Sequence, residues 1–293
     1  RGHKEMASLG MRALCGIPFI RIEKLSAYAN NYLEIFTNHL RDYDPLIKTG
    51  VFIQGLKTIN PEDLFLVKSL QDKYEDIRVM IHLAETVDDV EYCKNKYGVR
   101  PVEYLNQIGL LNDRCICVHL VHIENSEMEL IYESKANVVL CPSANLKLSS
   151  GRPPIEKFYQ NKIPFSLATD GLAVSGSASL LEQAKLASLI TGGRIPAHDL
   201  LRSITEIPYE ALGFKDGGKI VENKSANLAL FSYSPTALFP NKNLVSQLVH
   251  NYSIFQCQYL WVEGRLVLSN NTIVGHNEEK ITRSCLELLK QLL

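Results

Sequence analysis

Two histidines and an aspartate stand at or just beyond the ends of short apolar runs, where parallel α/β folds place their chemistry. The residues are His82, His119 and Asp170. They follow, in that order, the apolar runs 77–81, 115–118 and 163–168. Runs of this length predict strands buried on both faces. Imidazole and carboxylate groups bind metals and move protons, so these strand ends predict one metal and acid–base site.

Two further polar residues lie three positions beyond the histidines. Glu85 follows His82, and its carboxylate could move a proton beside a metal-bound water. The alternative is a core histidine followed by a glutamate that caps a helix, because a single His–Glu pair is a weak signal. His122 follows His119 and is interpreted as a loop or helix-start residue. The three strand ends together favour the functional interpretation.

A polar loop, residues 141–151, follows the apolar strand expected at 137–141. Asn145 in this loop could orient a substrate or could serve turn chemistry alone. Lys147 could be a solvated charge. The sequence has no dinucleotide fingerprint and no phosphate-binding loop.

Strands and helices alternate from Arg12 to about Gly213, which predicts a parallel sheet wound by helices, either a barrel or an open sheet. The first strand is expected near 12–16 and should end before Pro18. A helix with apolar spacing is expected at 22–41.

The pattern changes after Gly217. Two β-rich segments follow, 220–231 and 256–267, and Glu263-Gly264 is typical of a hairpin turn. An amphipathic helix closes the chain. The predicted divisions are a hydrolase barrel at 1–217, a β-sandwich segment at 218–275 and the helix at 276–293.

The composition excludes several classes of partner. The chain is 46% hydrophobic, so it can bury a large core, and its formal net charge is -1. We therefore expect no nucleic-acid partner and no membrane partner. Its seven cysteines show no zinc-knuckle or CxxC spacing, which predicts reduced thiols and a cytoplasmic location.

The polar motifs occur in the order found in the amidohydrolase superfamily. They are His82–Thr86, Arg100–Leu105, Gly109–Leu111, Val118–His122, the loop 141–151 and Thr169–Gly171, with a tail at 239–250. From about Gly10 onward the chain most resembles the 5-methylthioadenosine/S-adenosylhomocysteine deaminases, with their chlorohydrolase and guanine deaminase relatives.

The resemblance implies an α/β fold, a TIM-like (β/α)8 barrel with part of a small β-sandwich. It implies hydrolysis of an adenosine-like nucleoside or related amino-heterocycle, in which water attacks purine C6 and ammonia leaves. His82 would be a metal ligand and Asp170 both a ligand and a base. Glu85 would protonate the ring nitrogen, and His119 would assist the hydrolytic water. The metal would be one Zn²⁺ or Fe²⁺ per subunit, and a homo-oligomer is plausible.

The chain departs from the family pattern at several places. The family's first strand carries a His-x-His pair that supplies two metal ligands, and this chain has no such pair. Its motifs begin just before the third barrel strand, so the first two strands are expected to be missing. Gln54 stands where the family has a substrate-contacting histidine, 174–176 replaces a Ser-Asn-Asn segment, and Asn227 replaces an aspartate.

Three interpretations remain open. The first is a metal-dependent deaminase with Gln54, Glu85, Asn145 and Asp170 at the substrate. The second is a catalytically inactive amidohydrolase-like scaffold or fragment. The third is a chlorohydrolase-type enzyme that removes a halogen from an N-heterocycle. A His-x-His segment upstream in the full gene would favour an enzyme.

Overall fold

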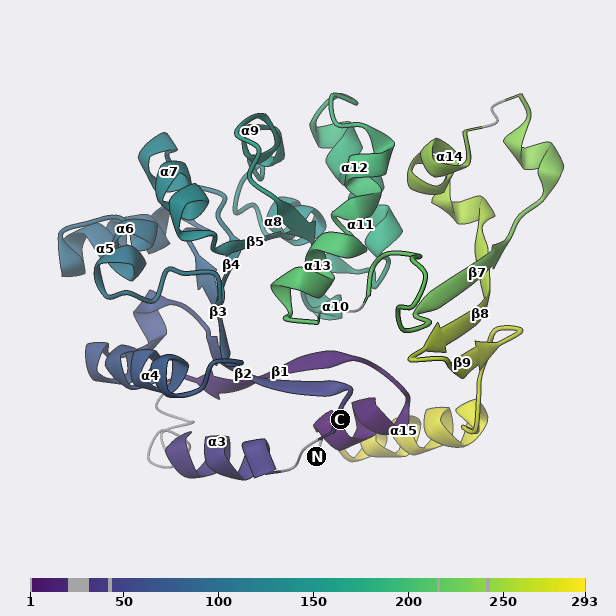
Figure 1. The fold of residues 1–293 in the computed structure, drawn as a ribbon, viewed down its shortest axis with the longest axis horizontal. Helices are drawn as coiled ribbons and strands as arrows, with labels where there is room; N and C mark the ends of the chain where they lie inside the picture. Colours follow the sequence, from purple (N-terminus) through teal and green to yellow (C-terminus); the bar gives the residue numbers. More distant parts are fainter. Residues whose placement is uncertain (1, 21–31, 42–43, 215–216, 241–242, 293) are drawn as a thin grey trace.

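A curved parallel sheet with helices on its outer face forms most of the molecule (Figure 1). The computed structural model describes residues 2–20, 32–41, 44–214, 217–240 and 243–292. Six strands pair in sequence order, each parallel to the next. They are β1 Ala13–Phe19, β2 Ile47–Ile53, β3 Arg78–Leu83, β4 Cys115–His119, β5 Asn137–Leu140 and β6 Phe165–Leu167. This sequential parallel order is that of a TIM-like barrel.

Within the described residues the sheet is open, because β1 pairs only with β2 and β6 only with β5. The helices that follow the strands are α3 Tyr32–Arg41, α4 Pro61–Lys73, α5 Val87–Tyr97, α6 Pro101–Gln107, α7 Asn125–Ser134, α8 Pro142–Lys147, α9 Ile155–Gln160, α10 Leu172–Ser175, α11 Leu180–Ile190, α12 Ala197–Arg202 and α13 Glu206–Ala211. The TIM-like fold class predicted from the sequence is confirmed.

Alternation along the strands divides the apolar side chains between two clusters. The larger cluster fills the space between the sheet and the helices and includes Ile81 and Leu140 from the strands and Phe158 from α9. The smaller cluster includes Ile116, Val118 and the partly buried Met80. These residues alternate with those of the larger cluster, so they face the inside of the curve. His82 lies two residues beyond Met80 on the same side of β3, which aims it into the interior.

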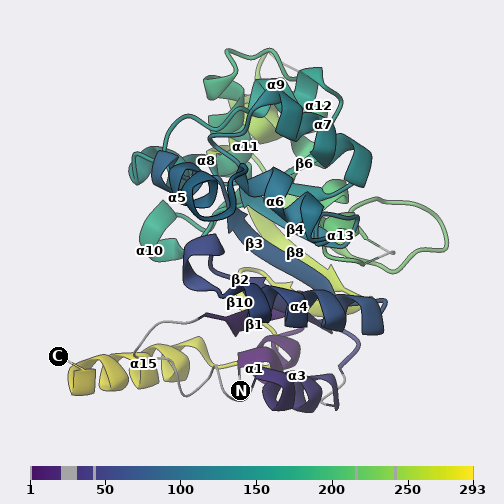
Figure 2. The same ribbon diagram turned by 90° about the vertical axis from the view of Figure 1, so that its left-hand side faces the viewer.

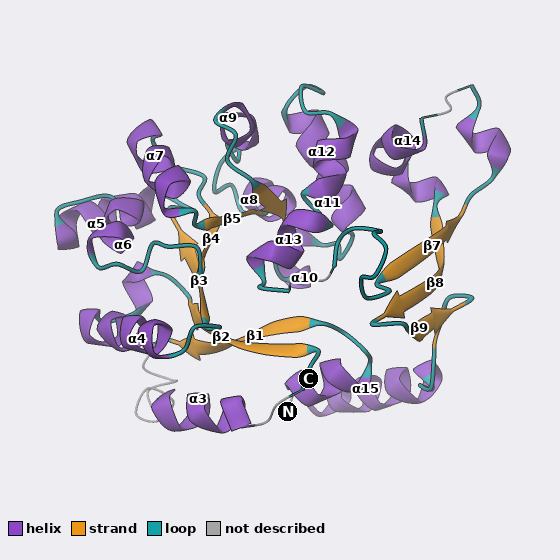
Figure 3. Cartoon of the chain, in the orientation of Figure 1, coloured by secondary structure: helices purple, strands orange, loops and turns teal. Residues whose placement is uncertain are grey.

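A small antiparallel sheet follows the barrel (Figure 3). Its strands are β7 Leu228–Ser232, β8 Gln256–Val262, β9 Arg265–Ser269 and β10 Thr272–Ile273. The helix α14 Leu244–His250 stands between β7 and β8 in the sequence. The predicted hairpin turn is confirmed between β8 and β9, where Glu263 and Gly264 have φ values of 51° and 77°. Two successive positive φ values match the twist of the strands that such a turn joins.

Glu263 also connects the small sheet to the barrel. Its carboxylate pairs with the Arg12 guanidinium just before β1 and accepts hydrogen bonds from Ser225 Oγ (2.6 Å) and Asn227 Nδ2 (2.8 Å). The Asn227 side-chain oxygen Oδ1 accepts in return from the Glu263 backbone N–H (3.1 Å). An aspartate at position 227 would set two carboxylates against each other, which explains why an amide suits this chain.

The helices α1 Gly2–Ser8 and α15 Glu278–Leu292 lie below β1 near the two ends of the chain (Figure 2). The predicted C-terminal helix is confirmed as α15. None of the helices among the described residues has the length and apolarity needed to cross a bilayer.

Two local predictions need correction, and a third concerns residues of which the structure describes only a part. The first strand does not end before Pro18 but continues to Phe19. Proline is tolerated there because β1 pairs with a single strand among the described residues, as an edge strand does. The loop 141–151 contains the short helix α8, which Pro142 begins at a position where proline fits. Of the helix predicted at 22–41, only α3 lies within the described residues.

Candidate active site

The ends of β3 and β4 bring the two predicted histidines into contact. In the parallel register His82 pairs with Val118 and Leu83 pairs with His119. The imidazole rings of His82 and His119 therefore lie edge to face, with centroids 4.8 Å apart at 65°. The sequence prediction that these strand ends meet is correct for this pair.

The backbone turns sharply at or just after the ends of β3, β4 and β6. Ala84, His119 and Asp170 adopt left-handed conformations, with φ values of 47°, 78° and 61°. Such conformations are costly for residues other than glycine and concentrate at functional sites. The turn at Ala84 lets His82 and Glu85 line the same cavity.

Glu85 is the centre of the polar network. One carboxylate oxygen, Oε1, accepts hydrogen bonds from Ser150 Oγ (3.0 Å) and Asn145 Nδ2 (3.4 Å). The other, Oε2, lies 3.7 Å from His119 Nε2. The side chain is 19% exposed, so it can reach a ligand in the adjoining cavity. The alternative of a helix-capping glutamate does not apply, because Thr86 and Asp89 form the capping box of α5.

Asn145 sets the proton position on His119. The Asn145 amide nitrogen lies 3.1 Å from His119 Nδ1, and both residues are almost fully buried. The same nitrogen faces the Glu85 carboxylate, which can only accept, so the amide must donate to both groups. His119 Nδ1 is then an acceptor, and Nε2 carries the proton on the side of Glu85.

His82 is held in its neutral form. Burial lowers the pKa of His82, and neighbouring His119 lowers it further, against the opposing effect of the Asp170 and Glu85 carboxylates. A neutral imidazole is the form that binds metals. Asp170 Oδ1 itself accepts from the Gly171 backbone N–H at 2.6 Å.

A cavity of about 360 Å³ opens beside His82 and Glu85. Gln54, at the end of β2, lines it and places its amide nitrogen 3.4 Å from His82 Nδ1. Lys57 also lines the cavity, and its ammonium group pairs with the carboxylates of Asp88 and Asp89. The cavity combines one carboxylate that can move a proton with an imidazole and an amide, which suits a small polar ligand.

Ser150 and His122 belong to this network, although no functional role was predicted for either from the sequence. The His122 imidazole contacts the Ser150 carbonyl, and Ser150 contacts Glu85. Their only sequence signal was their place in motifs of the family. Lys147, interpreted as a solvated charge, is exposed and donates to the Ala173 carbonyl at 3.2 Å.

The Cys141 thiol, which lies near the Asp170 and Glu85 carboxylates, is not poised for chemistry. Burial raises the pKa of Cys141 well above its ordinary value, and the Asp170 and Glu85 carboxylates raise it further. The thiol therefore stays protonated at neutral pH, and a thiol is a poor nucleophile and metal ligand.

The predicted metal ligands do not form a complete set. Among the residues that the structure describes, no group of three or more His, Cys, Asp or Glu side chains could hold a metal ion. His82 and Asp170 are two donors, whereas zinc in proteins takes at least three protein ligands.

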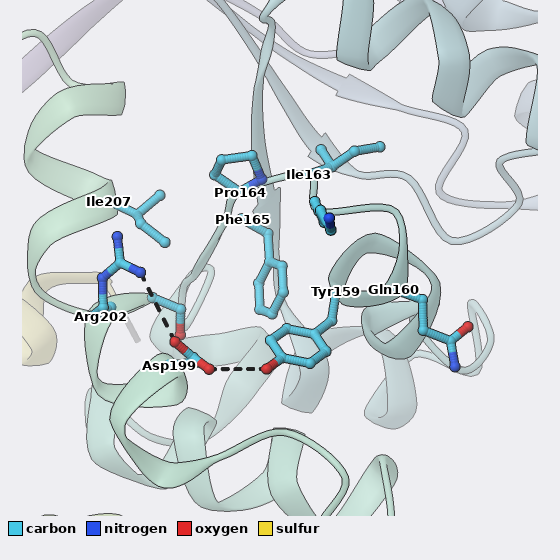
Figure 4. A pocket seen from close by; sticks show the side chains of 10 residues that line it. Tyr159, Gln160, Ile163, Pro164, Phe165, Asp199, Arg202 and Ile207 are labelled. Atoms are coloured by element: carbon cyan, nitrogen blue, oxygen red, sulfur yellow. Dashed lines mark hydrogen bonds and ion pairs between the residues drawn. The ribbon is translucent and has the colours of Figure 1, made fainter.

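A second cavity, of about 500 Å³, lies at the opposite end of β6 (Figure 4). Three of its polar side chains pair with one another, since the Tyr159 hydroxyl donates to Asp199 Oδ2 at 3.0 Å and Arg202 lies 3.9 Å from Asp199 Oδ1. It lies at the N-terminal end of the strand, away from His82 and Glu85, where barrels carry stability rather than chemistry.

The sequence matches a known family over most of its length. The amidohydrolase family profile matches residues 4–267. A 5-methylthioadenosine/S-adenosylhomocysteine deaminase from Dictyoglomus thermophilum is 31% identical over 238 residues, which cover 78% of this chain and 56% of the relative. The chain thus spans about half the length of the curated relatives it matches first, 56% in each case.

Solved structures share the same fold. The crystal structure of an adenosine deaminase from Xanthomonas campestris with bound zinc matches with a TM-score of 0.88 at 27% identity. The match covers 98% of this chain and 67% of that one. An atrazine chlorohydrolase from Arthrobacter aurescens complexed with zinc also has a TM-score of 0.88, over 98% of this chain and 68% of that one. Its 18% identity shows a common fold only.

Proposed function

The chain belongs to the amidohydrolase family, and from this premise we propose that it carries the proton-transfer part of a hydrolytic deaminase. The proposed substrate is an adenosine-like nucleoside of the 5-methylthioadenosine or S-adenosylhomocysteine type. The activity is that of a hydrolase acting on a C–N bond outside peptides. The names of the relatives support this substrate class, and the arrangement around Glu85 supports the chemistry.

One observation carries the proposal. The Glu85 carboxylate lies beside the His119 Nε2–H, both near His82, and Glu85 opens onto a cavity of about 360 Å³. Deamination needs a proton on the ring nitrogen of the base and then a proton on the departing amine. Both protons come from the attacking water: Glu85 would carry one to the ring nitrogen, and Asp170 would pass the other to the departing amine. His119, with its proton on Nε2, would donate a hydrogen bond to the oxygen that attacks the ring.

Asp170 and Asn145 would complete the chain's contribution. Asp170, on the turn after β6, would take a proton from the attacking water. Asn145 would contact the substrate only indirectly, because its amide is buried and holds both His119 and Glu85. Gln54 would contact the substrate from the exposed rim of the cavity.

The residues present do not by themselves fit a zinc ion. His82 and Asp170 would be two of its ligands, and two more would be needed for a closed tetrahedral set. The neutral state of His82 is consistent with such a role. Because the described residues hold no complete set, the steps above are assigned only to side chains of this chain.

A second candidate function follows from the incomplete set of metal ligands among the described residues. An amidohydrolase-like protein that has lost half of its ligands would be a non-catalytic scaffold. The buried network of Glu85, His119 and Asn145 argues against this, because a buried polar network is costly to keep unless it serves a purpose.

The test uses the full-length protein that contains this chain, purified with zinc. Ammonia release is measured with adenosine, 5-methylthioadenosine and S-adenosylhomocysteine, and metal content is measured on the same sample. We expect ammonia from at least one nucleoside, about one zinc per chain, and loss of activity in Glu85→Gln. Zinc-loaded protein that releases no ammonia would refute the deaminase, and metal-free inactive protein would support the scaffold.

A further inference from the structure

We propose that Ser150 is a positioning residue that fixes the direction of the Glu85 carboxylate, and that His122 holds Ser150 in place. This inference rests on the proposed function, in which Glu85 delivers a proton to the substrate. It adds two residues to that site from the loops after β4 and after α8.

Ser150 makes the shorter of the two hydrogen bonds to Glu85. Its hydroxyl donates to Oε1 at 3.0 Å, whereas Asn145 reaches the same oxygen at 3.4 Å. Both contacts fall on Oε1, which leaves Oε2 directed toward His119. A carboxylate held through one oxygen presents the other in a fixed direction, which a proton transfer requires.

Ser150 is itself tightly anchored. It is only 9% exposed, and its backbone N–H donates to the Asn145 carbonyl at 2.9 Å. Its carbonyl lies 2.8 Å from His122 Nε2. Because a carbonyl only accepts, Nε2 of His122 must carry a proton and donate it to this bond.

Hydrogen bonds to both the backbone N–H and the backbone carbonyl hold His122 in place. Its N–H donates to the Ala84 carbonyl at 3.0 Å, and its own carbonyl accepts from Arg100 Nη2 at 2.5 Å. Arg100 is held in turn by the fully buried Glu127 carboxylate at 2.8 Å. A continuous set of hydrogen bonds therefore runs from the helix layer to Glu85.

Gly151 brings the two loops into close contact. Its φ of 131° lies in the region that only glycine adopts readily. A side chain there would come within 2.8 Å of Val121 Cγ1. The close approach lets the Ser150 carbonyl reach the His122 ring.

The experiment compares variants of the full-length protein by kcat and KM for ammonia release. In Ser150→Ala we expect kcat to fall about 10- to 100-fold, as for the loss of one hydrogen bond to a charged group, while KM changes less than about threefold. Ser150→Thr keeps the hydroxyl and should retain kcat within about threefold. Ser149→Ala removes the hydroxyl of the exposed neighbouring residue and should leave both constants unchanged.

The double variant tests the link through His122. His122→Ala should lower kcat less than Ser150→Ala, and combining the two should add little, because both act on the same hydrogen bond. A Ser150→Ala enzyme with kcat within threefold of the wild type would overturn the inference. Equal losses in Ser150→Ala and Ser150→Thr would overturn it as well, since they would point to loop packing.

A structural measurement separates this inference from the proposed function. If the wild-type protein releases no ammonia, the deaminase proposal fails, and crystal structures of the wild type and Ser150→Ala decide the positioning role. A Glu85 carboxylate that turns away from His119 in the variant would support it. A carboxylate that keeps its place would overturn it.

Discussion

Asn145 gives the sharpest test of the hydrogen-bond directions in the site. The structure requires its amide nitrogen to donate to His119 Nδ1 at 3.1 Å and to Glu85 Oε1 at 3.4 Å. Asn145→Ala removes both donors and leaves the buried His119 nitrogen without a partner, which costs about 1–3 kcal/mol. The longer bond to Glu85 adds about 1 kcal/mol. We therefore expect a loss of about 2–4 kcal/mol in the free energy of unfolding.

Asn145→Asp keeps the shape but replaces the donor by a second carboxylate beside Glu85. Two like charges about 4 Å apart repel by about 4 kcal/mol at the effective dielectric of a protein surface. At pH 7 the aspartate variant should therefore be at least as unstable as the alanine variant.

Urea unfolding at pH 7 and at pH 5 measures both variants against the wild type. Like charges raise the pKa of the carboxylate pair, so the loss in Asn145→Asp should shrink as the pH falls and one carboxylate becomes protonated. An aspartate variant as stable as the wild type at pH 7 would refute the assignment. It would mean that His119 donates from Nδ1 to residue 145.

Four other substitutions test further contacts in the structure. Glu85→Gln should reduce turnover by on the order of 100-fold, and Asp170→Asn should abolish it with the fold intact, as measured by ammonia release and circular dichroism. Near-normal turnover in either variant would remove that residue from the mechanism. Asp89→Asn should lower the free energy of unfolding, measured in urea, by about 1 kcal/mol above pH 4. Burial alone would raise the pKa of Asp89, but the hydrogen bonds from Thr86 and the hydrogen bond and charge of Lys57 together outweigh it, and the pKa lies below the ordinary value. The stabilisation is therefore present above the ordinary pKa of about 4 and should disappear as the pH falls through the lowered value, and a pH-independent difference would contradict this. Glu263→Gln should make the small sheet more susceptible to limited proteolysis, and an unchanged cleavage pattern would show that this network does not hold the sheet to the barrel.

The meeting of His82 with His119 could be predicted because each ends a buried apolar run, and parallel strands end at one edge. The left-handed backbone conformation at these strand ends could not be predicted from the sequence. Ala84, His119 and Asp170 are left-handed, yet none is a glycine, the residue that marks such turns most clearly.

The role of Ser150 could not be predicted for a different reason. Its partner Glu85 lies 65 residues earlier, and a serine in a polar loop is ordinary turn chemistry. Pro18 shows the opposite case, a strong local signal that the edge position of β1 overrides. Local patterns thus predicted the strands, and the contacts between distant loops had to come from the structure.

The most direct test of the proposed deaminase is the fate of the oxygen of water. The full-length protein is incubated with 5-methylthioadenosine in isotopically labelled water, and the product is examined by mass spectrometry. The account predicts one labelled oxygen on the purine ring in place of the amino group, with one ammonia released per product. An intact amino group, or an oxygen that does not come from water, would contradict it.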